Sequence, residues 1–352
     1  MNLHFRELMQ KATRLTGTGN LRAATAAIQA ALGGSREAGP PQAASSQDVI
    51  DAPARELPSQ GPRARDEGFQ GEERFIEGSF GSGGAKREYK LFIPPGTGDR
   101  PLPLVVMLHG CTQNPDDFAA GTAMNEAARA QGFCVLYPAQ SRQANAQGCW
   151  NWFKHNHQER GRGEPALLAG MTREVMTQHA IDPARVYVAG LSAGGAMAAI
   201  LGAAYPELYA AVGVHSGLAA GAATDLPSAL AAMKSGAAAR AAAHGVPTIV
   251  FHGDADATVH PANGDQVIAA CAGAASEVAT HKVNGAGGRT STRRVHSDPS
   301  DGRVLGEHWL VHGASHAWSG GSSRGSYTDS RGPDATAEML RFFFEHPRGP
   351  VQ

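Results

Sequence analysis

The stretch from Arg185 to Met197 constrains the fold more than any other part of the chain. It reads RVYVAGLSAGGAM: a β-rich apolar run, a G-x-S-x-G pentapeptide centred on Ser192, and a run of small residues typical of a helix. Gly190 and Gly194 permit the close backbone approach that a sharp strand–turn–helix requires. Such a turn lifts the serine hydroxyl above a sheet, and the next helix aims its free N–H groups at any oxyanion that forms there. We predict that Ser192 is a nucleophile on this turn.

Apolar runs alternate with helical periodicities along the rest of the chain. Strands are predicted at 74–76, 87–93, 103–108, 133–137, 185–189, 210–214, 246–251 and 307–311, and helices at 116–131, 166–180, 193–205 and 334–344. This β–α order predicts an α/β fold with a doubly wound, mostly parallel sheet that binds ligands at the carboxyl ends of its strands. The polar stretch 284–303 is predicted as a hairpin that turns at Asp301-Gly302.

A serine hydroxyl needs a base, and the base needs an acid that orients it. In the α/β-hydrolase fold these residues follow the serine in the order acid, then histidine. Two carboxylates follow the strand at 246–251, and the spacing H-G-x-x-D-x-x-V favours Asp256 as the acid over Asp254. His316 lies in a Gly/Ser loop after the strand at 307–311 and is the predicted base.

The oxyanion of an acyl-transfer intermediate needs two backbone N–H donors. We expect them from Ala193, which follows the nucleophile, and from Cys111, in the loop after the early strand. Cys149 also lies beside a predicted active-site loop, and the sequence leaves open whether it forms a disulfide with Cys111. The four cysteines do not form a C-x-x-C pattern, so they predict no metal site.

Four aromatic residues lie near these loops: Trp150, Trp152, Phe153 and Trp318. Aromatic side chains in such loops form apolar walls for an acyl chain or a polymer, so we predict a substrate-binding role for them. The alternative is that they pack in the core beneath a long loop.

The amino-terminal region differs in composition from the rest. Residues 1–33 carry two apolar stripes at helical spacing and are predicted to form a helical hairpin, which docks on the core or binds a partner such as a hydrophobic particle. Residues 34–71 are rich in Pro, Gly, Ser and Gln and are predicted to be a disordered linker. Residues 72–352 are the predicted catalytic domain.

Charge and hydropathy exclude several classes of protein. Lys and Arg number 31 against 32 Asp and Glu, so no basic field favours nucleic acid. No apolar run is long enough to span a membrane. The first residues carry charges in every turn and lack the apolar core of a secretory signal, so we expect a cytoplasmic location.

Four motifs occur in one order: HGCTQ at 109–113, CWNWF at 149–153, GLSAGGAM at 190–197 and SHAW at 315–318. Together they resemble the esterase / poly(3-hydroxyalkanoate) (polyhydroxybutyrate) depolymerase family of α/β-hydrolases over about residues 72–346. The resemblance implies carboxylic-ester hydrolysis through an acyl-enzyme and needs no cofactor. It implies Ser192 as nucleophile, His316 as base and then acid, and Asp256 as the group that orients His316.

The family includes short-chain polyhydroxyalkanoate depolymerases as well as feruloyl and acetyl-xylan esterases. The long amino-terminal region resembles that of intracellular depolymerases of storage granules, so we favour a poly(3-hydroxybutyrate) depolymerase or oligomer hydrolase, with granule association as a hypothesis. A feruloyl or acetyl-xylan type esterase is the alternative. A non-catalytic granule-associated binding protein is a third hypothesis, and the presence of Ser192, Asp256 and His316 argues against it. The sequence leaves open the acyl-chain length and the oligomeric state.

Overall fold

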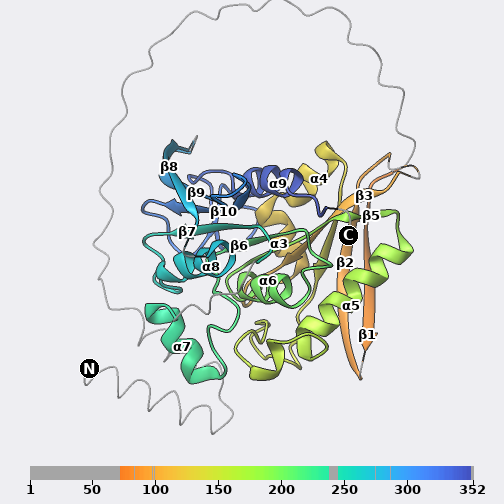
Figure 1. Ribbon diagram of the computed structural model, residues 1–352. Coiled ribbons are helices and arrows are strands. Elements are labelled where there is room, and N and C mark those ends of the chain that lie inside the picture. The colour runs from red at the N-terminus through yellow and green to blue at the C-terminus, as the bar shows by residue number, and fades with distance from the viewer. Residues whose placement is uncertain are drawn as a thin grey trace, which may run out of the picture. The chain divides into compact units, whose positions relative to one another are not determined.

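The computed structural model describes residues 72–349, except 83, 97, 99, 238–244, 274 and 286. The predicted hairpin at 1–33 and the predicted linker at 34–71 lie outside the described residues. A ten-stranded sheet with the order β1-β2-β4-β3-β5-β6-β7-β10-β9-β8 runs through the described part of the chain (Figure 1). Its strands are β1 (Arg74–Ser82), β2 (Ala85–Ile93), β3 (Leu102–Leu108), β4 (Cys134–Pro138), β5 (Ile181–Leu191), β6 (Ala211–His215), β7 (Thr248–Gly253), β8 (Glu277–Asn284), β9 (Thr290–Ser297) and β10 (Val304–Val311).

The six central strands, β4, β3, β5, β6, β7 and β10, pair in parallel. The outer strands β1, β2, β8 and β9 are antiparallel to their neighbours. Every residue of β3 is buried, which explains its continuous apolar sequence, because a central parallel strand is covered on both faces. The predicted mostly parallel sheet is therefore confirmed.

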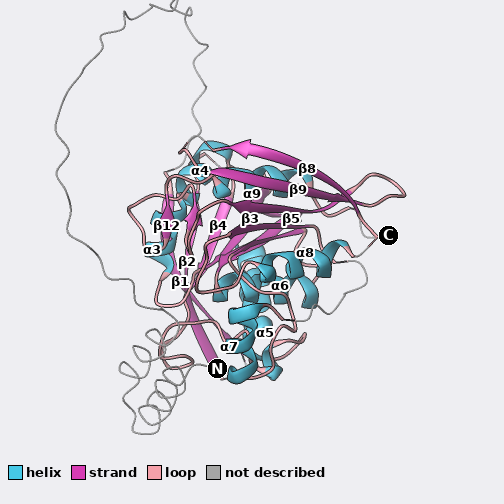
Figure 2. Cartoon of the chain, turned by 90° about the vertical axis from the view of Figure 1, so that its left-hand side faces the viewer, coloured by secondary structure: helices cyan, strands magenta, loops and turns pink. Residues whose placement is uncertain are grey.

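Helices cover both faces of this sheet. They are α3 (Pro115–Thr122), α4 (Met124–Gln131), α5 (Gly163–Gln178), α6 (Ala193–Ala204), α7 (Leu226–Ser235), α8 (Ala262–Ala272) and α9 (Ala335–Glu345), with a short 3-10 turn at His155–His157. Figure 2 shows α5, α6, α7 and α8 together on one side, where their buried residues share one hydrophobic cluster with the sheet. Residues of α3, α4 and α9 form a second cluster on the opposite face. The chain is thus doubly wound.

Two predictions of local structure need correction. The single helix predicted at 116–131 is two helices, because Ala123 adopts a left-handed conformation with φ 53° that ends α3 and begins α4. The chain does turn at Asp301-Gly302, where Gly302 has φ 72°, and β9 and β10 pair across that turn. The stretch 284–303 is nevertheless not an isolated hairpin, since β9 also pairs with β8 on its other edge.

Four loops that carry predicted site residues leave the sheet at the same edge. They follow the last residues of β3, β5, β7 and β10, which are Leu108, Leu191, Gly253 and Val311. Because these strands belong to the parallel part of the sheet, their carboxyl ends lie side by side. A short two-stranded sheet, β11 (Trp318–Ser319) with β12 (Thr328–Asp329), forms beyond β10.

Candidate active site

Ser192 occupies a strained turn between β5 and α6. Its backbone has φ 57° and ψ −118°, and its side chain does not cap α6. A Cβ atom on Gly190 or Gly194 would collide with the carbonyl oxygen of Leu108 at the end of β3. Strain of this kind costs about 1–3 kcal/mol and persists where the surroundings impose it. The two glycines let the turn press against β3 and leave the serine hydroxyl beside the N-terminus of a buried helix.

Asp256 and His316 are joined by a hydrogen bond. His316 Nδ1 lies 2.7 Å from Asp256 Oδ2, across loops that follow β7 and β10. Since a carboxylate can only accept, Nδ1 carries the proton and Nε2 keeps its lone pair. This is the tautomer that a base needs to accept a proton from a serine hydroxyl.

The carboxylate of Asp256 is buried and fully engaged. Its Oδ1 accepts from the amides of Thr258 and Val259, each at 2.9 Å, and its Oδ2 lies 3.5 Å from His252 Nε2. Burial alone would raise the pKa of this carboxyl, but hydrogen bonds from His252 and His316 hold the pKa well below its ordinary value. Asp256 therefore stays ionised and fixed in orientation.

Asp254, the alternative acid, has a different partner. Its Oδ2 lies 2.8 Å from His312 Nδ1, and its Oδ1 accepts from the amide of Gly313 at 2.7 Å. Both side chains of the Asp254–His312 pair are more than one-third exposed. The structure thus brings Asp256, and not Asp254, to His316.

His215 connects the serine turn to the loop of His316, and the sequence analysis missed it. Its carbonyl accepts from the amide of Ser192 at 2.8 Å, and its Nε2 accepts from the amide of Ser319 at 2.9 Å. Because Nε2 accepts, Nδ1 carries the proton and faces the hydroxyl of Ser216 at 3.2 Å. Burial, with the nearby charges of His252 and His316, lowers the pKa of His215 to about 3, so the ring stays neutral.

The predicted oxyanion donors are the backbone amides of Cys111 and Ala193. Cys111 lies in the loop that follows Leu108, and Ala193 precedes Gly194, which packs against the carbonyl of Leu108. In the loop after β3, the amide of Gly110 donates to Gln113 Oε1, and the amides of Thr112 and Gln113 donate to Gln147 and Gly110. The amide of Cys111 has no acceptor within the described part of the chain. Ala193 is the first residue of α6, where an amide has no intrahelical acceptor. Both amides are thus available to a ligand.

Cys111 and Cys149 form a disulfide, with their Cα atoms 4.3 Å apart. This answers the question that the sequence left open. Cys134 and Cys271 are free thiols, and burial raises the pKa of each, to about 12 and about 11. The disulfide ties the loop of Cys111 to the segment that carries the CWNWF motif.

Three of the four aromatic residues predicted to bind substrate are buried. Trp150, Trp152 and Trp318 are 0%, 5% and 1% exposed. Trp150 Nε1 donates to the carbonyl of His109 at 3.1 Å, and Trp318 stacks on His215 with ring centroids 5.0 Å apart. These tryptophans lie under the loops of the site, as the core-packing alternative expected. Phe153 is partly buried and packs against the hydrophobic cluster that contains Trp150 and Trp152.

Tyr327 is a further residue at this edge that the sequence analysis missed. It is 46% exposed, has φ 53°, and its hydroxyl lies 3.2 Å from Thr112 Oγ1, beside Cys111. Its carbonyl accepts from the amide of Trp318 at 2.7 Å. The side chain of Tyr327 is thus exposed, while its hydroxyl and its carbonyl contact the Cys111 loop and the His316 loop. No local pattern in the sequence signals this position of Tyr327.

Neither a metal site nor a membrane-spanning helix is found among the described residues. No group of three or more His, Cys, Asp or Glu side chains there could hold a metal ion. No helix there is both long and apolar enough to cross a bilayer.

The fold, the G-x-S-x-G turn at Ser192 and the Asp256–His316 hydrogen bond at the same sheet edge define the class of α/β-hydrolases. The chain belongs to the esterase PHB depolymerase family, whose model matches residues 87–290. The predicted family is thereby confirmed. The match includes Ser192, Asp256 and both cysteines of the disulfide, and it ends before His316.

Relatives of this chain carry different ester-hydrolase names. The poly(3-hydroxyalkanoate) depolymerase C of Paucimonas lemoignei is 33% identical over 204 residues, which cover 54% of this chain and 49% of the relative. The feruloyl esterase B of Thermothelomyces thermophilus is 30% identical over 151 residues, 43% of this chain and 50% of the relative. A probable acetylxylan esterase A of Neosartorya fischeri is 32% identical over 149 residues, 41% of this chain and 38% of the relative. The chain therefore spans about half or less of each of these relatives.

Solved structures confirm the fold. The acetyl xylan esterase from Aspergillus awamori matches with a TM-score of 0.59 at 19% identity, over 76% of this chain and 99% of that one. An S-formylglutathione hydrolase from Agrobacterium tumefaciens matches with a TM-score of 0.51 at 14% identity, over 78% and 98% of the two chains. At these identities the likeness concerns the architecture alone.

Proposed function

We propose that this protein is a serine carboxylic-ester hydrolase that works through an acyl-enzyme, with residues 72–352 as its catalytic domain. The observation that carries the proposal is the 2.7 Å hydrogen bond between Asp256 and His316 at the sheet edge where Ser192 is held in its strained turn. Family membership supports it, since relatives of this chain are named as esterases and depolymerases.

In the proposed reaction, Ser192 Oγ attacks the ester carbonyl carbon while His316 Nε2 takes the hydroxyl proton. The amides of Cys111 and Ala193 stabilise the oxyanion that forms. His316 then returns the proton to the departing alcohol oxygen as the carbon–oxygen bond breaks, which leaves an acyl group on Ser192. A water molecule, deprotonated by His316, releases the acid and restores the serine. Asp256 keeps His316 in the required tautomer throughout.

We propose poly(3-hydroxybutyrate), or another short-chain polyhydroxyalkanoate or its oligomers, as the substrate. Two relatives, at 33% and 32% identity, are named as depolymerases of these polymers. A feruloyl or acetyl-xylan type specificity is the second candidate, because other relatives at 30% and 32% identity carry those names. Tyr327 and Phe153 are the proposed substrate contacts that retain exposed surface, whereas the three tryptophans support the site from below.

The experiment that tests the proposal compares substrates with a matched inactive variant. Wild type and Ser192→Ala are incubated with amorphous polyhydroxybutyrate granules, methyl ferulate, acetylated xylan and p-nitrophenyl butyrate. Release of 3-hydroxybutyrate by wild type alone would support the depolymerase. Hydrolysis of ferulate or xylan esters without granule hydrolysis would favour the second candidate. Equal activity of Ser192→Ala would contradict the assignment of the nucleophile, and granule binding without any hydrolysis would favour a binding protein.

The proposed cytoplasmic location has one observation against it. Disulfides persist mainly in oxidising compartments, and Cys111 and Cys149 form one. Cell fractionation with thiol trapping tests the location directly. Reduced Cys111 and Cys149 in the cytosolic or granule fraction would support the cytoplasm, and an oxidised pair in an extracytoplasmic fraction would contradict it.

A further inference from the structure

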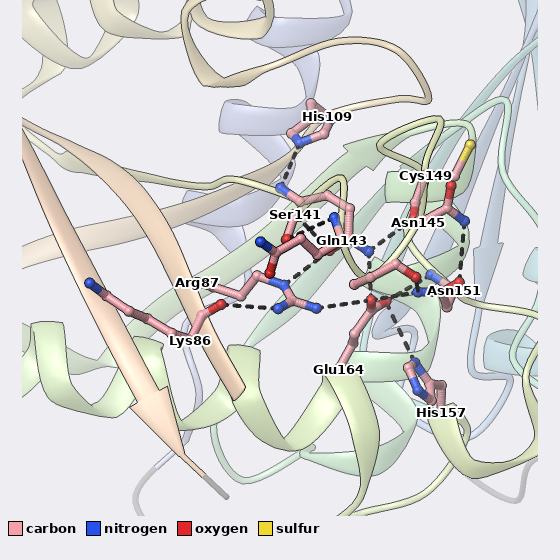
Figure 3. Close-up of polar contacts among 12 residues, drawn as sticks. Lys86, Arg87, His109, Ser141, Gln143, Asn145, Cys149, Asn151, His157 and Glu164 are labelled. Carbon is pink, nitrogen blue, oxygen red and sulfur yellow. Dashed lines mark hydrogen bonds and ion pairs between the residues drawn. The ribbon is translucent and has the colours of Figure 1, made fainter. Parts of the chain in front are cut away.

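The segment that carries Cys149 is anchored on a buried carboxylate. Glu164, in the first turn of α5, is 3% exposed. Its Oε2 accepts from the amide of Asn151 at 2.7 Å, and its Oε1 accepts from Asn151 Nδ2 at 2.8 Å (Figure 3). The same Oε1 accepts from Gln140 Nε2 at 2.5 Å. Arg87 and His157 face the same carboxylate at 3.5 and 3.6 Å. Burial would raise the pKa of Glu164, but hydrogen bonds from His157, Gln140 and Asn151 hold the pKa below its ordinary value, so the anchor is a charge.

Gln140 connects this anchor to the loop that follows β3. Its Nε2, besides binding Glu164, donates to the carbonyl of Cys149 at 2.9 Å, and its Oε1 accepts from Arg87 Nε at 3.0 Å. Its backbone amide donates to His109 Nε2 at 3.1 Å. Every polar atom of the Gln140 side chain is thus engaged, and its position is fixed from both sides.

The amide of Cys111 is held indirectly, through His109 before it in the chain and through the Cys111 side chain. On one side, His109 is bound by Gln140 through its ring and by Trp150 Nε1 through its carbonyl. On the other, the Cys111 side chain is bonded to Cys149, whose carbonyl binds Gln140. The buried network therefore connects Glu164 to the residue before Gly110 and to Cys111 itself.

We propose that Glu164, Gln140 and Trp150 are positioning residues that fix the orientation of the Cys111 amide as an oxyanion donor. This inference rests on the proposed esterase function. Donors in an oxyanion hole act on the charge of the transition state, and loss of one costs about a hundredfold or more in rate. A donor that is loosened, and not removed, should cost about tenfold. The effect should fall on kcat and leave KM almost unchanged, because the ground-state ester carries no full charge.

The test uses the full chain in two variants with matched controls. Glu164→Gln keeps the shape of the anchor and removes its charge, and Trp150→Phe removes the bond to His109. Glu207→Gln, an exposed carboxylate paired with surface arginines, and Trp309→Phe, a buried tryptophan on β10, are the controls. The measurements are kcat and KM for p-nitrophenyl butyrate, the inhibition constant of a butylboronic acid that adds to Ser192 as a tetrahedral anion, and the unfolding temperature.

We expect Glu164→Gln and Trp150→Phe to lose about tenfold or more in kcat and a similar factor in boronate affinity, with KM within about threefold of wild type. The controls should retain wild-type kinetics. If Glu164→Gln does not fold, Trp150→Phe decides. Wild-type kcat and boronate affinity in a folded variant, or a change in KM alone, would overturn the inference while the proposed function stands. A wild-type protein without Ser192-dependent hydrolysis would overturn both.

Discussion

Replacing His215 by glutamine should make the fold less sensitive to acid. The ring is buried, and its Nε2 accepts a hydrogen bond from the amide of Ser319. A proton added to Nε2 would therefore face this N–H group. The ring is therefore held neutral, with a pKa of about 3 in place of its ordinary 6.5. Glutamine offers a carbonyl acceptor to Ser319 and does not titrate. It therefore keeps the hydrogen bond without the free-energy cost of excluding a proton.

The expected size follows from proton linkage. Above pH 6.5 the ring is neutral in both the native and the unfolded chain, and it has no effect on the pH dependence of stability. Below pH 6.5 the unfolded chain binds a proton that the native chain excludes until about pH 3, so stability falls as the pH falls. Each pH unit in this window costs about 1.4 kcal/mol. Acidification from pH 7 to pH 4.5 should thus remove about 2–3 kcal/mol of unfolding free energy through His215.

The assay is urea denaturation of wild type and His215→Gln at pH 7.0 and pH 4.5. His109 and His308 are also buried with lowered pKa values, but both proteins contain them, so their contributions cancel in the comparison. Wild type should lose about 2–3 kcal/mol more than the variant between the two conditions. An equal loss in the two proteins would refute the argument that the native fold excludes a proton from His215.

Three further predictions follow from the site. Asp256→Asn should lower kcat for p-nitrophenyl butyrate about 10³–10⁴-fold, because it removes the acceptor that selects the histidine tautomer, whereas Asp254→Asn should change it less than threefold. The double variant Cys111→Ser/Cys149→Ser, compared with wild type by denaturation, should be destabilised by about 4 kcal/mol, since the disulfide closes a loop with a sequence separation of 38. Tyr327→Ala should raise KM for hydroxybutyrate oligomers at least fivefold while Tyr327→Phe stays near wild type, if the ring itself contacts substrate; equal KM values in all three proteins would exclude that contact.

The positions of the site loops could be predicted because their signals are local. The G-x-S-x-G turn at Ser192 and the strand ends before Asp256 and His316 are each visible within a dozen residues. Parallel pairing then places such loops at one edge, and the hydrogen bond between Asp256 and His316 follows from that topology. Ala123 shows where such local signals fail. The sequence pattern predicted one helix, but the positive φ of this non-glycine residue divides it into α3 and α4.

The supporting residues could not be predicted because their partners are distant in the sequence. His215 binds Ser319 across 104 positions, and no spacing rule connects them. Whether Cys111 and Cys149 form a disulfide depends on how closely the fold brings their Cα atoms together. The burial of Trp150 likewise depends on its packing against His109. A tryptophan in a polar loop has the same local pattern whether it faces substrate or core. Only the tertiary structure distinguishes the two.

The contact between the serine turn and β3 has a consequence for how such an enzyme can diverge. Gly194 leaves no room for a side chain against Leu108, and the same carbonyl limits Gly190. A substitution at either glycine therefore displaces the nucleophile and the start of the Cys111 loop together. Point mutations that change substrate preference have to leave this junction intact. Exposed residues outside this junction, such as Tyr327 between β11 and β12, are where substitutions can be accommodated.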